Sequence, residues 1–279
     1  MNLKQAFKIF IYCLLVSCTC SSCFFYGKTL VYDDFEGIEK DSSAIVNILI
    51  IHGIGLKPVN YADDLLQNFK DELGLSIDPQ KKIEILPDFL TNLKLPPTYT
   101  GGIYYIEGKS YKTNQLYRFF VVHWSPITYK FKNDLVSYDQ DHRRSSISNY
   151  FKTKIVNQNF ADIAAYTDST YNSYIQKLVE QAFILTFKKS SEIMVKKVSY
   201  KSPSSLHVIS GSFGSKIVLD VWNNHMKWLK KIIPQYTAED FHRLTFFTYN
   251  PGLSAAIETL IVAKPINFFM LTNQLPLFS

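Results

Sequence analysis

The sequence predicts an α/β fold in which helices flank a mostly parallel sheet. Residues 45–51 (IVNILII) form a β-branched, nearly continuous apolar run, which is typical of a strand buried on both faces. Short strand patterns alternate with helical patterns along the rest of the chain, as they do in parallel sheets. Two strand patterns also lead directly into glycine-bearing turns, at 52–55 and 210–215. Because ligands gather at the carboxyl ends of parallel strands, both turns are expected to face one cleft.

Each element is assigned from its own periodicity. Helices are predicted where apolar residues recur every three or four positions, as Leu66, Phe69 and Leu73 do. Strands are predicted from short β-branched or aromatic runs bounded by turn residues. The polar stretch 131–170 receives no element and carries a loop at 139–146. The predicted elements in chain order are strand 45–51, helix 61–73, strands 101–106 and 116–124, helix 171–197, strand 206–209, helix 213–231, helix 255–263 and strand 266–271.

Composition bounds the class of protein. The 279 residues are 47% hydrophobic and 19% charged, which is enough for a sizeable core and argues against disorder. Nothing requires more than one domain, which we place at residues 45–279. The net charge of +6 comes from scattered lysines and arginines, so a mildly basic solvated surface is expected and no nucleic-acid partner.

The N-terminus has the layout of an export signal. Lys4 and Lys8 precede a short apolar run and then small residues, and the run is too short to span a bilayer. All four cysteines lie between positions 13 and 23, so no disulfide framework supports the rest of the chain. Residues 1–23 are therefore expected to be a signal segment and residues 24–44 a tether.

Residues 15–18, Leu-Val-Ser-Cys, resemble the lipobox of bacterial lipoproteins. The resemblance implies that Cys18 is lipidated and becomes the mature N-terminus. An exported protein anchored to a membrane by that lipid is then expected, at the outer membrane or the periplasmic face. A plain signal cleaved elsewhere and an uncleaved anchor are the alternatives.

The turn after strand 206–209 places Ser212 between Gly211 and Phe213, in a stretch that is otherwise made of small residues. A strand that reverses sharply into a helix needs small neighbours at its tip, and the tip residue then projects into the cleft. The unpaired amides of the following helix point at the same place and can hold a developing oxyanion.

Residues 210–215 (SGSFGS) resemble the Gly-x-Ser-x-Gly nucleophile elbow of α/β-hydrolases, with serine in place of the first glycine. Residues 52–55 (HGIG) resemble the family's His-Gly loop. The resemblance covers residues 45–279 and implies an α/β-hydrolase fold and a serine esterase or lipase with Ser212 as nucleophile. It implies a small-molecule or lipid-like ester substrate and no cofactor. No metal site is expected either, because the sequence after the N-terminal cysteines contains no His-x-x-x-His or paired-cysteine spacing. The remaining implied site residues are the oxyanion amides of Ile54 and Phe213 and the supporting turn residues His52, Gly53, Gly55, Ser210, Gly211 and Gly214.

The acid and the base of a catalytic triad are not evident. In the family both follow the nucleophile along the chain, and only one strand pattern follows here, so the fold is expected to be incomplete at its C-terminus. His242 is the one downstream histidine that geometry allows as base. His225 would lie about 20 Å along the helix from Ser212. The other histidines, His52, His123, His142 and His207, are assigned to backbone, packing or solvated roles.

Two alternatives remain open. The chain could be a hydrolase-like lipoprotein without catalysis, or a truncated enzyme, with a binding role. Residues 211–216 (GSFGSK) could also form a phosphate loop around Lys216, although they lack the glycine-lysine-serine order of the Walker motif.

Overall fold

A computed structural model describes residues 38, 40–85, 101–141, 161–196, 204–232 and 267–271 of the chain. The chain divides into two compact units, residues 1–40 and residues 41–279, and the features below belong to the second unit. The predicted signal segment with Cys18 and the predicted helix 255–263 lie outside the described residues.

The described strands form one mixed sheet in the order β2-β3-β4-β1-β5-β6. The pairs β4–β1, β1–β5 and β5–β6 run parallel, whereas β2–β3 and β3–β4 run antiparallel. The predicted α/β class with a mostly parallel sheet is therefore confirmed. The strands are β1 (Ile45–Ile51), β2 (Ile83–Ile85), β3 (Gly102–Lys109), β4 (Leu116–His123), β5 (Ser204–Gly211) and β6 (Asn267–Leu271).

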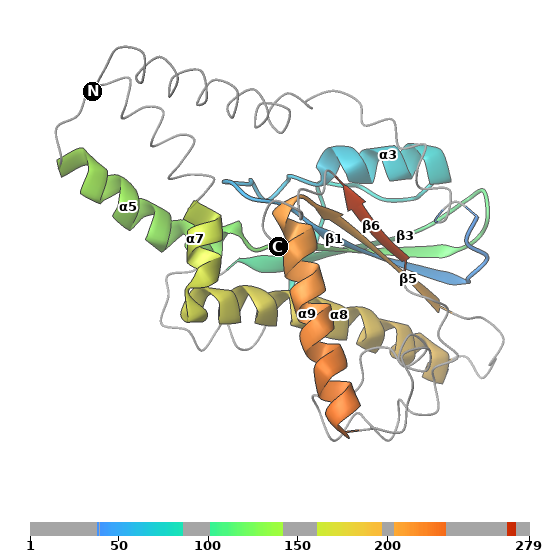
Figure 1. Cartoon of the computed structure of the whole chain (residues 1–279). Helices are drawn as coiled ribbons and strands as arrows, with labels where there is room; N and C mark the ends of the chain where they lie inside the picture. Colours follow the sequence, from blue (N-terminus) through green and yellow to red (C-terminus); the bar gives the residue numbers. More distant parts are fainter. Residues whose placement is uncertain are drawn as a thin grey trace, which may run out of the picture. The chain divides into compact units, whose positions relative to one another are not determined.

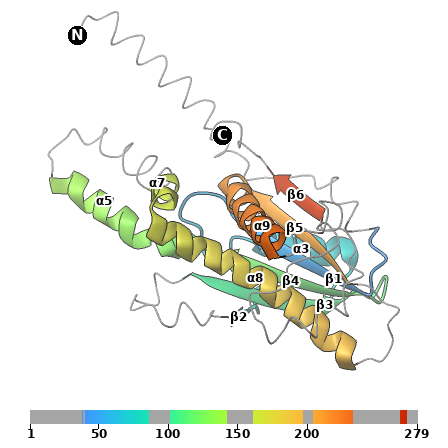
Figure 2. The same cartoon turned by 60° about the horizontal axis from the view of Figure 1, so that its bottom comes forward.

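Helices cover both faces of the sheet (Figure 1). One face carries α3, and the opposite face carries α8 and α9, as the turned view also shows (Figure 2). The helix α9 begins two residues after β5 ends. The described helices are α3 (Asp63–Leu73), the 3-10 helix η3 (Ser125–Thr128), α5 (Tyr129–Asp141), α7 (Ala161–Thr167), α8 (Ser169–Lys196) and α9 (Phe213–Ile232).

Two helices lie in the stretch that the sequence left without an element. The first, α5, begins at Tyr129, two residues before that stretch, and its last residues include the start of the predicted loop at 139–146. The second, α7, is only seven residues long, with Ala161, Ala165 and Tyr166 buried. A helix of two turns has too few positions to show a helical period, which is why the sequence did not reveal it. The three-residue strand β2 was missed for the same reason.

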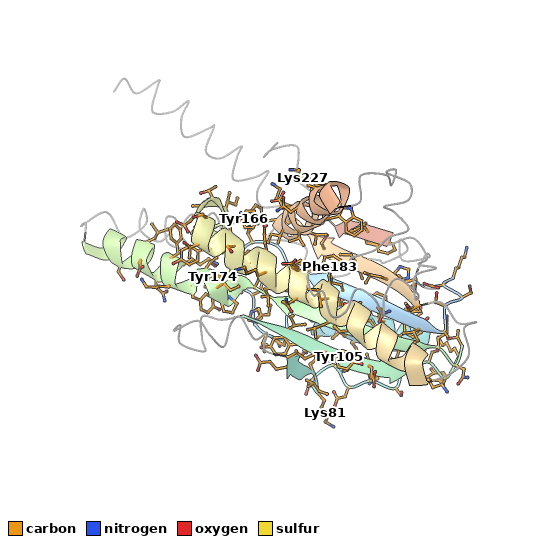
Figure 3. All side chains as sticks on the ribbon, turned by 90° about the horizontal axis from the view of Figure 1, so that it is seen from below. Lys81, Tyr105, Tyr166, Tyr174, Phe183 and Lys227 are labelled. Atoms are coloured by element: carbon orange, nitrogen blue, oxygen red, sulfur yellow. The ribbon has the colours of Figure 1, made fainter. Side chains whose placement is uncertain are left out.

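The core lies on both sides of the sheet. Every residue of β1 is buried, as its continuous apolar run predicted. Phe119 of β4 packs against Phe69 of α3 on one face, and Phe120 belongs to the cluster on the opposite face. That cluster includes Phe183 of α8 and Tyr105 of β3, both labelled in Figure 3. Alternation along a central strand thus supplies both cores.

A polar pair joins the chain before β1 to the adjacent strand β5. The Asp41 carboxylate lies 2.8 Å from Nε2 of His207, and the two side chains are 5% and 0% exposed. Burial alone would raise the pKa of Asp41, but hydrogen bonds from His207, Ser205 and Ser43 lower it below its ordinary value. The carboxylate therefore stays charged at neutral pH and anchors the start of the unit.

Replacing Asp41 tests this anchor. Asp41→Ala leaves His207 buried without its carboxylate and should lower the free energy of unfolding by about 2 kcal/mol. Asp41→Asn keeps an oxygen acceptor and should cost less than half as much. Urea unfolding at pH 7 measures both changes, and equal losses in the two variants would contradict the role of the hydrogen bond.

Candidate functional site

The four strands that follow one another across the sheet as β4, β1, β5 and β6 end at the same edge. Ile51 at the end of β1 pairs with Val122 on one side and Ser210 on the other. Gly211 at the end of β5 pairs with Leu271 at the end of β6. The loop after β1, the helix η3 after β4 and the turn after β5 therefore emerge side by side. The expectation that the two glycine-bearing turns lie at the same edge of the sheet is met by this register.

Ser212 occupies the tip of the turn between β5 and α9 in an unusual backbone conformation. Its φ is +49°, and among the described non-glycine residues only Asn114 shares a positive φ. A left-handed backbone costs a serine about 1 kcal/mol or more, so the surrounding structure must hold it there. The Ser215 amide donates to the Ser212 carbonyl at 3.0 Å, so the helix begins at once. The arrangement is a sharp strand-to-helix elbow.

Two glycines let the loop after β1 and the elbow pack backbone to backbone. A Cβ on Gly214 would lie 2.4 Å from the His52 carbonyl oxygen and 3.0 Å from that of Ile51. A Cβ on Gly53 would lie 3.0 Å from the Ser212 Cβ and 3.0 Å from the Gly211 carbonyl oxygen. No side chain fits at position 214 without moving backbone. The two turns are therefore in direct contact at Ser212.

Serine at position 210, where the elbow motif has glycine, finds its own partner. Ser210 is completely buried, and its hydroxyl lies 3.0 Å from the hydroxyl of Ser215, which is equally buried. The Ser215 hydroxyl also donates to the Ser210 carbonyl at 3.1 Å. The pair satisfies both hydroxyls inside the turn, so the departure from glycine leaves the geometry intact. The sequence contained Ser215, but its role depends on this contact.

The two amides predicted to form an oxyanion hole lie at this contact. Ile54 directly follows Gly53, and Phe213 is the first residue of α9. Within the described part of the chain, neither amide donates a hydrogen bond. An N-terminal helix amide has no partner within its own helix and carries the positive end of the helix dipole. Both amides are thus available to a negatively charged oxygen.

The ring of His52 holds the loop against the segment after β4. The amides of Trp124 and Ser125 lie 3.2 and 3.4 Å from Nε2, and backbone amides only donate, so Nε2 is assigned as the unprotonated nitrogen. The protonated Nδ1 then donates to the Gly53 carbonyl at 2.7 Å. Trp124 stacks on the ring and donates its indole N–H to the His52 carbonyl at 2.9 Å. Both ring nitrogens are therefore engaged, and this histidine is not placed to take a proton from Ser212.

The protonation state of His52 follows from its surroundings. Burial, first, and then the positive charges of Lys57 and Lys132 and the nearby His123 lower its pKa well below the ordinary value, against the opposing hydrogen bond to Gly53. The ring is neutral at physiological pH, which the acceptor role of Nε2 requires.

A buried carboxylate that sequence reasoning missed holds the other end of the same loop. Gly55, with a φ of +101°, donates its amide to Oδ2 of Asp162 at 2.6 Å. Asp162 lies on α7 and is fully buried. It comes from the polar stretch without an assigned element, so only the tertiary fold reveals its partner.

The remaining predicted residues are partly outside the described chain. His242, the predicted base, and His142 lie outside it, as does Cys18. His225 falls within α9. His123 is buried and its Nε2 lies 2.7 Å from the Lys57 carbonyl, while His207 is bound to Asp41. The described histidines with known contacts, His52 included, are thus all occupied by structural partners.

Lys216, on which the phosphate-loop alternative depends, is bound to its own helix. Its ammonium lies 2.6 and 2.8 Å from the two carboxylate oxygens of Asp220, one turn further along α9. Asp220 also accepts a hydrogen bond from Tyr166 at 2.9 Å. A phosphate would have to displace this carboxylate.

Across the described residues, no three histidines, cysteines or acids are grouped so that they could hold a metal ion. Nor does the described part include a helix long and apolar enough to cross a membrane. No family model matches the chain, and comparison with curated proteins and with solved structures likewise gives no match. The resemblance to α/β-hydrolases therefore rests on the residues and the geometry above.

Alanine substitutions at Gly214 and Gly211 test whether the turn needs glycine because of the close contact at position 214 or because of backbone flexibility in general. Gly214→Ala forces a methyl group against the His52 carbonyl and should destabilise the fold by about 3 kcal/mol. Gly211→Ala is the matched control, because its Cβ would lie 3.9 Å from the nearest atom, the Gly53 nitrogen, and should cost less than about 1 kcal/mol. Thermal or urea unfolding measures both. Similar losses in the two variants would mean that the loop after β1 and the elbow do not pack backbone to backbone at Gly214 as described.

Because His52 is neutral in the folded chain, its contribution to the free energy of unfolding should fall as the pH drops. Below about pH 6.5 the unfolded chain protonates this histidine and the folded chain does not, so the unfolded state binds more protons and the histidine's contribution to stability falls as the pH drops. The destabilisation caused by His52→Gln should therefore shrink by about 1 kcal/mol between pH 7 and pH 5.5. In the NMR spectrum of the unmutated chain, the His52 ring protons should not titrate over that range. A titration near pH 6.5 would refute the assignment.

Proposed function

We propose that the chain is a serine hydrolase of the α/β-hydrolase type that cleaves an ester or related acyl bond through an acyl-Ser212 intermediate. The observation that carries the proposal is the backbone of Ser212, held at a φ of +49° against Gly53 at the carboxyl edge of the sheet. A strained serine beside two backbone amides that donate no hydrogen bond within the described residues, those of Ile54 and Phe213, is an arrangement suited to acyl transfer.

The chemistry assigns a role to each group. The Ser212 oxygen attacks the carbonyl carbon of the substrate, and its proton passes to a base. The amides of Phe213 and Ile54 stabilise the negative charge that develops on the carbonyl oxygen. The alcohol leaves with the proton from the base, and water, activated by the same base, then releases the acid and restores the hydroxyl. His242 is the proposed base.

The order of the elements supports the proposed fold. A strand followed by the His-Gly loop, and a later parallel strand followed by the serine elbow, lie next to one another as β1 and β5. Export and lipid attachment at Cys18 belong to the same proposal and rest on the N-terminal sequence alone.

A second candidate function is favoured by the occupied histidines. His52, His123 and His207 are each bound to structural partners, so no base for Ser212 is present among them. A hydrolase-like protein that binds a ligand at this edge without cleaving it would need the elbow but no base.

Reaction with a fluorophosphonate distinguishes the two functions, because only an activated serine is phosphonylated. The purified chain should be labelled, Ser212→Ala should not, and Ser169→Ala, an exposed serine at the start of α8, should be labelled like the unmutated chain. His242→Ala should reduce the rate at least 100-fold if it is the base.

Two labelling results would contradict the proposed hydrolase. Labelling that persists in Ser212→Ala would place the nucleophile elsewhere. A folded chain that is not labelled at all would reject the hydrolase in favour of the binding protein.

A further inference from the structure

We propose that Asp162 is a positioning residue that fixes the orientation of the loop after β1, and with it the Ile54 amide. The catalytic consequence rests on the function proposed above, whereas the anchor itself does not. The inference starts from one contact: the Gly55 amide donates to Asp162 Oδ2 at 2.6 Å, across 107 residues of sequence.

The carboxylate is held in place by its own set of partners. Its other oxygen, Oδ1, accepts a hydrogen bond from the Thr128 hydroxyl at 2.6 Å and lies 2.6 Å from the Lys132 ammonium. Thr128 and Asp162 are completely buried and the Lys132 side chain is 3% exposed. Because both carboxylate oxygens are engaged, the acceptor of the Gly55 amide cannot rotate away.

A buried ion pair contributes little net free energy to the stability of a fold. Removing two charges from water costs several kcal/mol per ion, and apolar residues of similar volume often serve stability as well or better. What the pair supplies here is an oriented acceptor for one backbone amide. That amide belongs to Gly55, which directly follows Ile54. The acceptor therefore also restricts the orientation of the Ile54 amide.

Two anchors enclose the Ile54 amide. On its N-terminal side the His52 ring is held by the amides of Trp124 and Ser125, and on its C-terminal side Gly55 is held by Asp162. Trp124 and Ser125 lie on the segment that follows β4, and so do Thr128 and Lys132, which hold Asp162 in place. With both ends of a four-residue loop fixed, the peptide between Gly53 and Ile54 has little freedom to turn. The amide that would meet the oxyanion is thereby preorganised.

The test compares two double variants that both lack the ion pair but differ in the acceptor. Asp162→Leu with Lys132→Met replaces the pair by apolar residues of similar volume and removes the acceptor of Gly55. Asp162→Asn with Lys132→Met also removes both charges but keeps an oxygen that can accept from Gly55. Asp220→Asn, which changes a carboxylate on α9 that does not touch the loop, is the control for a general effect of charge.

Two measurements are made on each variant at a temperature well below its unfolding midpoint. Amide hydrogen exchange of Gly55, followed by NMR, reports the anchor and requires no catalysis. The rate of fluorophosphonate labelling at Ser212 reports the preorganised amide.

The leucine–methionine variant should exchange the Gly55 amide at least 10-fold faster and be labelled about 10- to 100-fold more slowly. The asparagine–methionine variant and Asp220→Asn should stay within about 3-fold of the unmutated chain in both measurements. If the leucine–methionine variant fails to fold, Thr128→Val, which removes one hydrogen bond to Asp162, should show smaller changes in the same direction.

The results that would overturn the inference are distinct from those that overturn the function. Gly55 exchange that is equal in the leucine and asparagine variants would show that Asp162 is not the anchor. Faster exchange with an unchanged labelling rate would show that the anchor does not serve Ser212. An unmutated chain that is not labelled would overturn the proposed function and the catalytic consequence, and the exchange rates would still decide whether the anchor exists.

Discussion

The constraint on which the site depends is the contact between the backbone of Gly214 and the carbonyl oxygen of His52, which leaves no room for a side chain. This contact fixes how closely α9 approaches the end of β1. Once that distance is set, β5 must reverse into α9 within a single residue, and Ser212 must take the left-handed conformation. The strain at Ser212 is therefore a consequence of close packing between two parallel strands and the helix that follows one of them. The serine is placed by the backbone around it and needs no side-chain contact of its own.

The segment after β4 supplies the second half of the arrangement. Trp124 binds His52 through its amide, its indole and its ring face, and η3 and α5 present Thr128 and Lys132 to Asp162. This short stretch thus contacts the loop directly at His52 and supports its other end indirectly, by holding the Asp162 carboxylate that binds Gly55. It also explains why His52 must be neutral, since a protonated Nε2 would face amide donors. His52 is a structural clamp in this fold, so the proposed function requires a proton acceptor for Ser212 from elsewhere in the chain.

The sequence predicted those helices and strands whose hydrophobic pattern can be recognised within the segment itself. The continuous apolar run of β1 and the helical periods of α8 and α9 reflect burial that each segment undergoes by itself, so a pattern reveals them. The short helix α7 and the strand β2 have too few residues to show a period. Asp162 and Ser215 were missed for a different reason. A buried carboxylate in a polar stretch looks like any solvated acid until its partner, 107 residues away, is known. The two glycine-bearing turns were found because glycines that directly follow a strand pattern are visible in the local sequence. Their contact with each other depends on the pairing of β1 with β5, which the local sequence does not show.

The central claim is that the amides of Ile54 and Phe213 converge on the carbonyl oxygen of a substrate whose carbon Ser212 attacks. A crystal structure of the chain with a phosphonate bound to Ser212 tests it most directly. The account predicts that the phosphonyl oxygen lies about 2.7–3.1 Å from both the Ile54 and the Phe213 amide nitrogens, with the φ of Ser212 still positive. An oxygen that points to solvent, or a Ser212 that relaxes to a negative φ, would contradict it.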